Sequence, residues 1–407
     1  MSSRSNRWPL IFITLTLALD ATGIGLILPV MPDLIRDVEG GSLGDAAVWG
    51  GILATAYAVM QFLFGPLLGR LSDSVGRRPV LLVSLGAMAL TYAGMALAQT
   101  LWMLLAARIL GGMAAATQAT AAASLSDLAK PGQKAQTFGL IGAAFGVGFV
   151  IGPLAGGLLS ELGPRAPFIA AGLLALANLA LGAMVLPETV TKTMRRRFDG
   201  RGCNPFAAFG PLPDMPGVGR LLLLFFLYEF AFVVYPATWA FFGQEAFGWS
   251  AATVGLSLTL FGVMMAIVQG GLIRLIIPRL GEAGTVVYGF CYNALIFAAM
   301  ATVSDGRVAL ILTPMAALGA VVTPALQSLM ARRAGDDRQG ELQGLVSAMR
   351  AVAMFLAPLA MTQVFFAFTD PANPLPYLPG AAFGLSVAIM LLCLAIFLPV
   401  ARRVAAV

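Results

Sequence analysis

The sequence predicts an all-α integral membrane protein with twelve transmembrane helices in two similar halves. Hydrophobic residues make up 59% of the 407 positions and charged residues only 11%, whereas a soluble domain carries about 25% charged residues. Apolar segments of helix-spanning length recur along the whole chain, and the second half resembles the first at a constant offset. These three observations exclude a water-soluble protein and indicate a duplicated bundle of membrane helices.

Breaks of glycine, proline and charge delimit the predicted helices in order. Each apolar run is about 20 residues long, enough for a helix to cross roughly 30 Å of hydrocarbon. The first run follows Arg4 and Arg7 and contains Asp20, and without a nearby cleavage site it is interpreted as an uncleaved helix. The predicted spans are 8–30, 47–69, 79–98, 101–124, 136–159, 166–186, 218–242, 251–275, 284–303, 307–330, 341–368 and 378–399.

The basic residues predict the orientation. Of the 25 Lys and Arg residues, 20 lie in the terminal segments and the even-to-odd connections or at the span ends beside them, three lie in the opposite connections, and two lie well inside spans. Basic residues collect on the cytoplasmic side of membrane proteins. Both termini are therefore predicted to be cytoplasmic, and the positive net charge requires no nucleic-acid partner.

An internal repeat predicts the domain organisation. "QTFGLIGA" at 136–143 matches "ELQGLVSA" at 341–348, an offset of 205 residues. We expect an N-terminal six-helix half over 1–186, a cytoplasmic linker over 187–217 and a C-terminal six-helix half over 218–407. Parallel halves with a binding site at mid-membrane are typical of transporters.

A charged motif interrupts the apolar sequence between the second and third spans. "GRLSDSVGRRP" places Gly69, Asp73, Gly76, Arg77 and Arg78 close together. A positive-inside loop explains the arginines but not the aspartate or the glycines. The stretch resembles the signature loop of the major facilitator superfamily, which implies that Asp73 is a gating charge facing the N-terminus of the eleventh helix. A carboxylate at a helix N-terminus gains about 0.3–1 kcal/mol.

A glycine-rich motif lies in the fifth span. Small residues let helices approach closely and proline bends a helix, so ordinary packing accounts for the glycines alone. The full pattern GxxxGPxxGG resembles the motif shared by antiporters of the same superfamily, and "RILGG" from Arg108 resembles its fourth-helix motif. The glycine-rich stretch comprises Gly148, Gly152, Pro153, Gly156 and Gly157.

Further stretches resemble the tetracycline/proton antiporters within that superfamily. They include "LDATGIGLILPVMP" from Leu19, "LPET" from Leu186 and "PALQSLMAR" from Pro324. This resemblance covers essentially the whole chain. It implies efflux of a drug-like compound in exchange for protons.

Ionisable residues inside a membrane are costly and are functional candidates by default. From the helix rise, Asp20, Glu229 and Arg350 lie about 18, 16 and 14 Å from the cytoplasmic ends of their helices, and Arg108 lies about 10 Å from the other side. Asp20 and Glu229 are the candidate proton-coupling groups. The candidates for the substrate cavity are Arg108, Gln118, Gln327 and Arg350.

Each of these charges could instead be part of a structural ion pair. Glu229 and Arg350 have opposite charge and similar depth in one half, and either left alone in low dielectric would be expensive. We therefore predict a Glu229–Arg350 pair, with Asp20 and Arg108 as a looser counterpart in the first half. Aromatic residues from Tyr228 to Trp239 could line an apolar pocket, face lipid or belong to the core.

The chain departs from the tetracycline antiporters at two places. The acidic residues that this subfamily carries in helices 3 and 9 align with Thr91 and Cys291, neither of which is acidic. Two acids balanced by two arginines do not suit a cationic metal–drug chelate. The substrate is therefore left open between tetracycline and another amphipathic or partly anionic compound.

The sequence thus predicts a proton-coupled antiporter of the bacterial inner membrane that works as a monomer by alternating access. Its expected partners are a small molecule, protons and the lipid bilayer; no cofactor or metal is expected. Without histidine or an acidic cluster, an enzyme is not predicted. The alternatives are a metabolite or sugar transporter of the same superfamily, as symporter or exporter, and a transport-inactive sensor.

Overall fold

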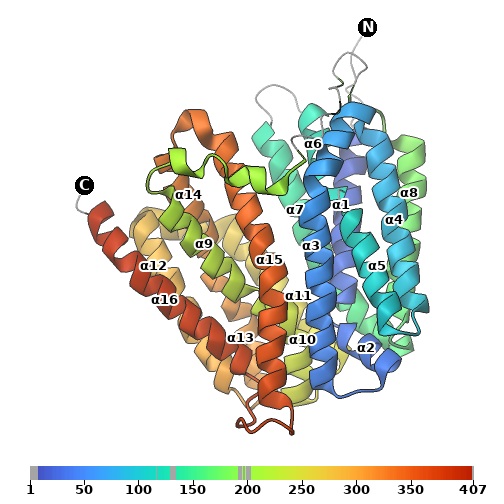
Figure 1. The fold of residues 1–407 in the computed structure, drawn as a ribbon, viewed down its shortest axis with the longest axis vertical. Helices are drawn as coiled ribbons and strands as arrows, with labels where there is room; N and C mark the ends of the chain where they lie inside the picture. Colours follow the sequence, from blue (N-terminus) through green and yellow to red (C-terminus); the bar gives the residue numbers. More distant parts are fainter. Residues whose placement is uncertain are drawn as a thin grey trace. The chain divides into compact units, whose positions relative to one another are not determined.

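The computed structural model describes residues 8–115, 117–128, 134–190, 195, 198 and 203–405. Over these residues every regular element is a helix. The chain divides into two compact units, one of Met1–Glu39 with Ala56–Pro205 and one of Gly40–Thr55 with Phe206–Val407. Figure 1 shows the helices coloured in chain order.

The first unit is built around α1, which packs along α7 and also contacts α6 and α8, while α4 packs on α5, α6 and α8. It contains α1 (Trp8–Ile27), α2 (Met31–Glu39), the second part of α3 (Leu43–Val75), α4 (Arg77–Leu97), α5 (Leu101–Met113), α6 (Thr117–Leu128), α7 (Lys134–Leu159), η1 (Ser160–Leu162) and α8 (Ala166–Val185).

The second unit begins with the first part of α3 and continues after the central polar segment. Its further elements are η3 (Pro205–Phe209), η4 (Leu212–Asp214), α9 (Val218–Phe232), α10 (Val234–Phe247), α11 (Ala251–Ile267), η5 (Val268–Leu272), α12 (Ile273–Thr302), α13 (Gly306–Ala316), η6 (Ala317–Val321), α14 (Val322–Ala334), η7 (Asp336–Arg338), α15 (Gln339–Thr369) and α16 (Ala381–Ala405).

Both units use the same pattern of helix packing. In the first, α1 contacts α6, α7 and α8, and α4 contacts α6 and α8; in the second, α9 contacts α14, α15 and α16, and α12 contacts α14 and α16. Counted from the start of each half, the helices in these pairs correspond to the same predicted spans: the first contacts the fourth, fifth and sixth, and the third contacts the fourth and sixth. The internal repeat in the sequence therefore has a counterpart in the packing of each unit.

The predicted spans coincide with apolar helices. Ten helical stretches of the described chain are long and apolar enough to cross a membrane, and one of them, Ala251–Thr302, contains two predicted spans. The remaining span is divided between the shorter α5 and α6. Side chains such as Trp102, Val83 and Leu97 are 72%, 71% and 70% exposed, as expected of faces that contact lipid.

The structure corrects the predicted loop between the second and third spans. Residues 70–75 continue α3, and Arg77 and Arg78 begin α4, so Gly76 alone forms the turn. Its φ of 122° lies in the region that favours glycine, which lets the chain reverse within one residue. The motif is therefore held on two helix ends, rather than on a flexible loop. The short helix α2 is a second element that the apolar pattern did not predict.

Candidate functional site

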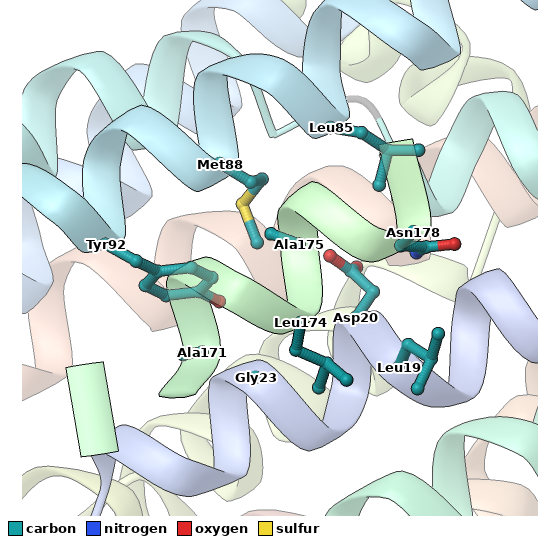
Figure 2. Close-up of a pocket in the computed structure, with 10 residues that line it drawn as sticks. All are labelled: Leu19, Asp20, Gly23, Leu85, Met88, Tyr92, Ala171, Leu174, Ala175 and Asn178. Atoms are coloured by element: carbon teal, nitrogen blue, oxygen red, sulfur yellow. The ribbon is translucent and has the colours of Figure 1, made fainter. Parts of the chain in front are cut away.

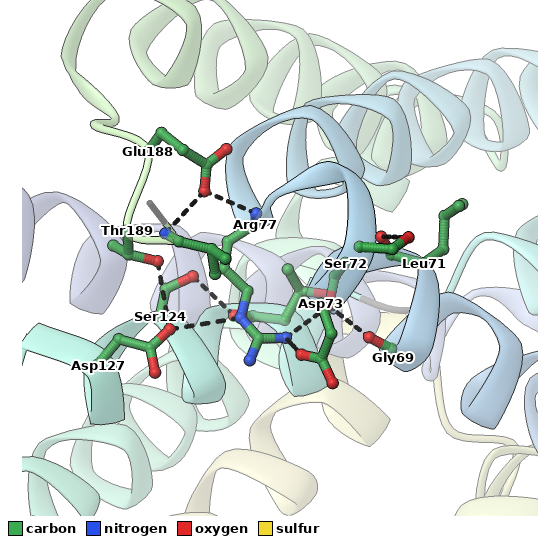
Figure 3. Close-up of polar contacts among 12 residues, drawn as sticks. Gly69, Leu71, Ser72, Asp73, Arg77, Ser124, Asp127, Glu188 and Thr189 are labelled. Atoms are coloured by element: carbon green, nitrogen blue, oxygen red, sulfur yellow. Dashed lines mark hydrogen bonds and ion pairs between the residues drawn. The ribbon is translucent and has the colours of Figure 1, made fainter. Parts of the chain in front are cut away.

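Arg77 is the centre of a charge cluster in the first unit (Figure 3). Its Nη1 lies 2.6 Å from Asp73 Oδ1, and its Nε lies 3.4 Å from Asp127 Oδ2. Nη1 also donates to Ser72 Oγ at 2.6 Å. One guanidinium thus joins a carboxylate at the end of α3 to one at the end of α6. This geometry explains why an aspartate stands among the arginines of the motif.

Glu188 caps the helix that follows the motif, a role that motif reading did not predict. Its carboxylate accepts from the backbone N–H groups of Arg77 at 2.8 Å and Arg78 at 3.3 Å. A carboxylate at this end of α4 satisfies free N–H groups and complements the helix dipole. A Cβ at Gly76 would lie 2.2 Å from Glu188 Oε2, so only glycine leaves room for the cap.

The remaining motif residues have simpler contacts. The Arg78 Nη2 group donates to the Ala183 carbonyl at 2.6 Å, which ties the start of α4 to the end of α8. Gly69 lies in α3, and its carbonyl accepts from Ser72 Oγ at 2.7 Å. Among the residues described, nothing lies within 4 Å of the position that a Gly69 Cβ would take.

The second unit carries a matching ion pair with the charges exchanged. Glu282 Oε1 lies 3.0 Å from Arg332 Nη2 and accepts from Ser328 Oγ at 2.5 Å. Adding the repeat offset of 205 to Arg77 and Asp127 leads to Glu282 and Arg332. The position equivalent to Asp73 is Pro278, so comparing the aspartate alone gives no charged counterpart. Comparing Arg77 at the same offset would have identified Glu282 from the sequence.

The glycine motif holds α7 directly against α1. A Cβ at Gly148, Gly152 or Gly156 would lie 2.3, 2.6 or 2.2 Å from the carbonyl oxygens of Ala18, Thr22 and Leu26, respectively. Pro153 packs at the same crossing, since its Cδ would lie 2.8 Å from a Cβ at Gly25. Gly157 is buried, and its carbonyl accepts from Ser160 Oγ at 2.5 Å. This crossing spans the turns of α1 around Asp20.

Replacing Gly148 with alanine is therefore expected to separate α7 from α1 and to lower the melting temperature of the purified protein. The matched control is Gly146→Ala on the same helix, where nothing described lies within 4 Å of the added Cβ. That control should be neutral or slightly stabilising, because alanine favours a helix over glycine by about 0.5–1 kcal/mol. Equal melting temperatures for the two variants would contradict the close crossing.

Asp20 is buried inside the first unit, where no described residue supplies a counter-charge. Its side chain is 8% exposed and makes no hydrogen bond or ion pair with any residue in the described part of the chain. Together with α4 and α8 it lines a small cavity, which also contains Tyr92 and Asn178 (Figure 2). Asn178 Oδ1 accepts from Thr16 Oγ1 at 3.1 Å.

The looser pair predicted between Asp20 and Arg108 is wrong as a direct contact. Arg108, on α5, places its guanidinium 5.6 Å from the ring centroid of Tyr57, and its buried Nε has no hydrogen-bond partner among the described residues. Two features place Arg108 beside Tyr57. Its guanidinium stacks on the Tyr57 ring, and a glycine on α5 lets that helix cross close to α3. A Cβ at Gly112 would lie 2.4 Å from the Tyr57 carbonyl oxygen. Arg108 therefore lies against the Tyr57 ring of α3 and makes no contact with the Asp20 carboxylate of α1.

The predicted pair between Glu229 and Arg350 is confirmed in the second unit. Arg350 Nε donates to Glu229 Oε2 and Nη2 donates to Oε1, both at 3.2 Å. Thr323 Oγ1 donates to the same Oε1 at 3.2 Å, and the Arg350 guanidinium lies 5.3 Å from the centroid of Phe225. A two-point contact holds α9 and α15 together and leaves the carboxylate well satisfied.

Two glutamines complete the predicted candidates. Gln327 is half-buried on α14, one turn after Thr323. Gln118 lies on α6, but its side chain falls outside the described residues.

Several aromatic residues of the seventh span are core residues, whereas Phe226, Phe230 and Phe232 are half-buried. Tyr235 and Trp239 are 5% and 1% exposed, and Tyr235 packs 5.6 Å from the ring of Phe261 and 5.5 Å from that of Phe383. Trp239 Nε1 donates to Ser257 Oγ at 2.8 Å. For Tyr235 and Trp239, this burial favours the core over a lipid-facing position.

The two positions that lack the subfamily acids differ in their surroundings. Thr91 is buried on α4, and Cys291 is exposed on α12. Asn293, the nearest polar residue to Cys291 along α12, donates through Nδ2 to the carbonyls of Gly289 at 2.7 Å and Gly319 at 3.0 Å. Asn293 therefore fixes α12 against η6.

Repeated helix packing, apolar spans and charged pairs at helix ends define a multi-pass membrane protein built from a duplicated unit. The family model of the Major Facilitator Superfamily matches residues 11–358. The chain belongs to this superfamily, whose members are transporters of small molecules.

Within the superfamily, the chain is similar to tetracycline resistance proteins and to an organic anion transporter. The chain is 40% identical to the class C tetracycline resistance protein of Escherichia coli over 92% of its length and 94% of that protein. It is 35% identical to the class G protein of Vibrio anguillarum, with 97% of each chain covered. Among solved structures, the human organic anion transporter MFSD10 (TETRAN) is 26% identical with a TM-score of 0.69, covering 97% of this chain and 100% of that one.

Proposed function

We propose that the chain exports a small amphipathic compound from bacteria in exchange for protons, by alternating access. The observation that carries this proposal is the buried carboxylate of Asp20, which has no partner among the described residues and lies beside the glycine crossing of α1 and α7. A carboxyl group in such a place exchanges a proton when its surroundings change. The tetracycline resistance proteins at 40% and 35% identity support an efflux function.

Asp20 and Glu229 have different roles in this proposal. Asp20 meets no cation in the described structure and carries the proton. Glu229 is already neutralised by Arg350 at 3.2 Å, so its pair opens and closes during transport or on substrate binding. Arg108, Gln118, Gln327 and Arg350 provide the polar contacts to substrate.

The substrate class follows from charge. Arg108 has unused donor capacity among the described residues, and Thr91 and Cys291 supply no carboxylate for a cationic chelate. A compound with an anionic group suits this set better than a cation. Similarity to the human organic anion transporter MFSD10 supports an anionic substrate. Similarity to the tetracycline resistance proteins supports tetracycline itself.

Location and assembly complete the proposal. The bacterial relatives support placement in the inner membrane, with both termini and the 187–217 linker cytoplasmic and the monomer as the working form. Basic residues on one side of the membrane support this orientation.

Everted vesicles from a pump-deficient bacterial host test the function. With an acidic lumen, adding tetracycline or carboxyfluorescein should cause accumulation of the transported compound and alkalinisation of the lumen. Vesicles with an Asp20→Asn variant should show neither. A symporter would instead release preloaded compound from the acidic lumen, and no movement of either compound in either direction would contradict the proposal for both substrate classes.

A further inference from the structure

The carboxyl group of Asp20 faces a small cavity of the first unit. The cavity has a volume of about 10 Å³ and is bordered by α1, α4 and α8. A buried water needs at least roughly 10–15 Å³ and two to four polar partners. The space is therefore sufficient for one water molecule and too small for a substrate.

Three polar side chains line this cavity, and each has hydrogen-bonding capacity to spare. Asp20, Tyr92 and Asn178 are 8%, 4% and 2% exposed. Neither the Asp20 carboxylate nor the Tyr92 hydroxyl has a partner within the described part of the chain. Asn178 bonds only to Thr16 there, which leaves amide capacity free. Figure 2 shows the Asp20 carboxylate between the Tyr92 hydroxyl and the Asn178 amide.

A glycine on α1 brings the hydroxyl to the site. A Cβ at Gly23 would lie 2.9 Å from Tyr92 Oη, so the missing side chain lets the hydroxyl approach the turn after Asp20. The remaining wall is apolar and consists of Leu19, Leu85, Met88, Ala171, Leu174 and Ala175. Buried polar groups in native proteins bond to protein or to ordered water.

We infer that this cavity is a hydration site in which one water molecule links the Asp20 carboxyl to Tyr92 and Asn178, with Asn178 as the residue that positions the water. Water both donates and accepts hydrogen bonds. It therefore accepts from the protonated carboxyl and donates to the carboxylate, and Asp20 can change protonation state without moving. The role of the site in transport rests on the proposed function of Asp20; its hydration does not.

Other titratable groups near Asp20 come from the packed helices. Tyr92 is on α4, Tyr57 on α3 and Arg108 on α5, and both tyrosines are within electrostatic reach of Asp20 and Arg108. In the described parts of α7 and α8 no charged side chain lies in the span. Arg108 stacks on Tyr57, which leaves the inferred water as the nearest mobile partner for the carboxyl.

Infrared difference spectroscopy on the purified full-length protein, between acid and alkaline pH, tests the site. The parent should show an Asp20 carboxyl C=O band, assigned by its loss in Asp20→Asn, and a water O–H band that shifts in H₂¹⁸O. Ala175→Val fills the cavity without removing a polar group. Both Ala175→Val and Asn178→Leu should lose the ¹⁸O-sensitive band and move the carboxyl band to higher frequency.

Thr16→Val is the matched control, because it removes the hydrogen bond that the Thr16 hydroxyl donates to Asn178 and leaves the cavity lining intact. It should keep both bands, whereas a purely structural role of Asn178 would make it resemble Asn178→Leu. An unchanged spectrum in Ala175→Val would overturn the hydration site. If Asp20→Asn instead transports like the parent while the water band behaves as expected, the proton role of Asp20 fails and the hydration site stands.

Discussion

Replacing Glu229 with glutamine is expected to lower the amount of folded protein in the membrane and its melting temperature. Both Glu229 oxygens accept from Arg350, and the Glu229 side chain is only 12% exposed. The variant leaves the arginine cation without a counter-charge. Removing one partner of a fully buried pair costs about 3–5 kcal/mol. Because Arg350 is 43% exposed, solvent screening reduces the expected cost to about 1–3 kcal/mol.

The double variant Glu229→Gln with Arg350→Gln should regain folded yield, since no unpaired charge remains. Glu341→Gln, at an exposed position in the first turn of the same α15, is the control and should lower the yield and the melting temperature far less, because a carboxylate there contributes only about 0.3–1 kcal/mol. A single Glu229→Gln variant as stable as the parent would refute the pair as a structural contact. If the double variant still exports substrate against a proton gradient, the Glu229–Arg350 pair is structural only. If the double variant is stable but its transport is no longer coupled to protons, the pair takes part in the transport cycle.

Asp73→Asn is expected to insert and fold like the parent but to lower turnover at equal expression by about tenfold or more, a barrier change of about 1.4 kcal/mol. The side chain is 35% exposed and pairs with Arg77 at 2.6 Å, so its contribution to stability is small. The amide keeps the shape and removes the charge of the proposed gate. Initial rates in everted vesicles, normalised to immunoblot, measure the effect.

Asp73→Glu should restore part of this activity, because it returns the charge with a longer side chain. Asp37→Asn is the matched control: Asp37 is 41% exposed and pairs with Arg165 at 3.0 Å in the same unit, outside the motif. It should transport like the parent. Turnover of Asp73→Asn at the parental rate would show that the charge has no part in gating.

Several features of the fold were predictable because they depend on local sequence. Apolar length predicts membrane helices, and all twelve predicted spans fall on helices. The depth of Glu229 and Arg350 followed from the helix rise alone, and equal depth with opposite charge was enough to predict their contact. The depths of Asp20 and Arg108 matched less well. These two side chains do not touch, because the direction in which a helix side chain points is set by how the helix is rotated against its neighbours.

The membrane class, the duplication and the charged residues inside the spans follow from the amino-acid order, because composition, period and repeat offset need no knowledge of how helices pack. The groups that these residues contact depend on the tertiary fold. Glu188 caps α4 from a position 111 residues after Arg77, Glu282 and Arg332 replace the first unit's pair with reversed charge, and Asn178 joins Asp20 at one cavity. Such contacts arise from the rotation and crossing of helices distant in sequence, which close packing sets and no local pattern encodes.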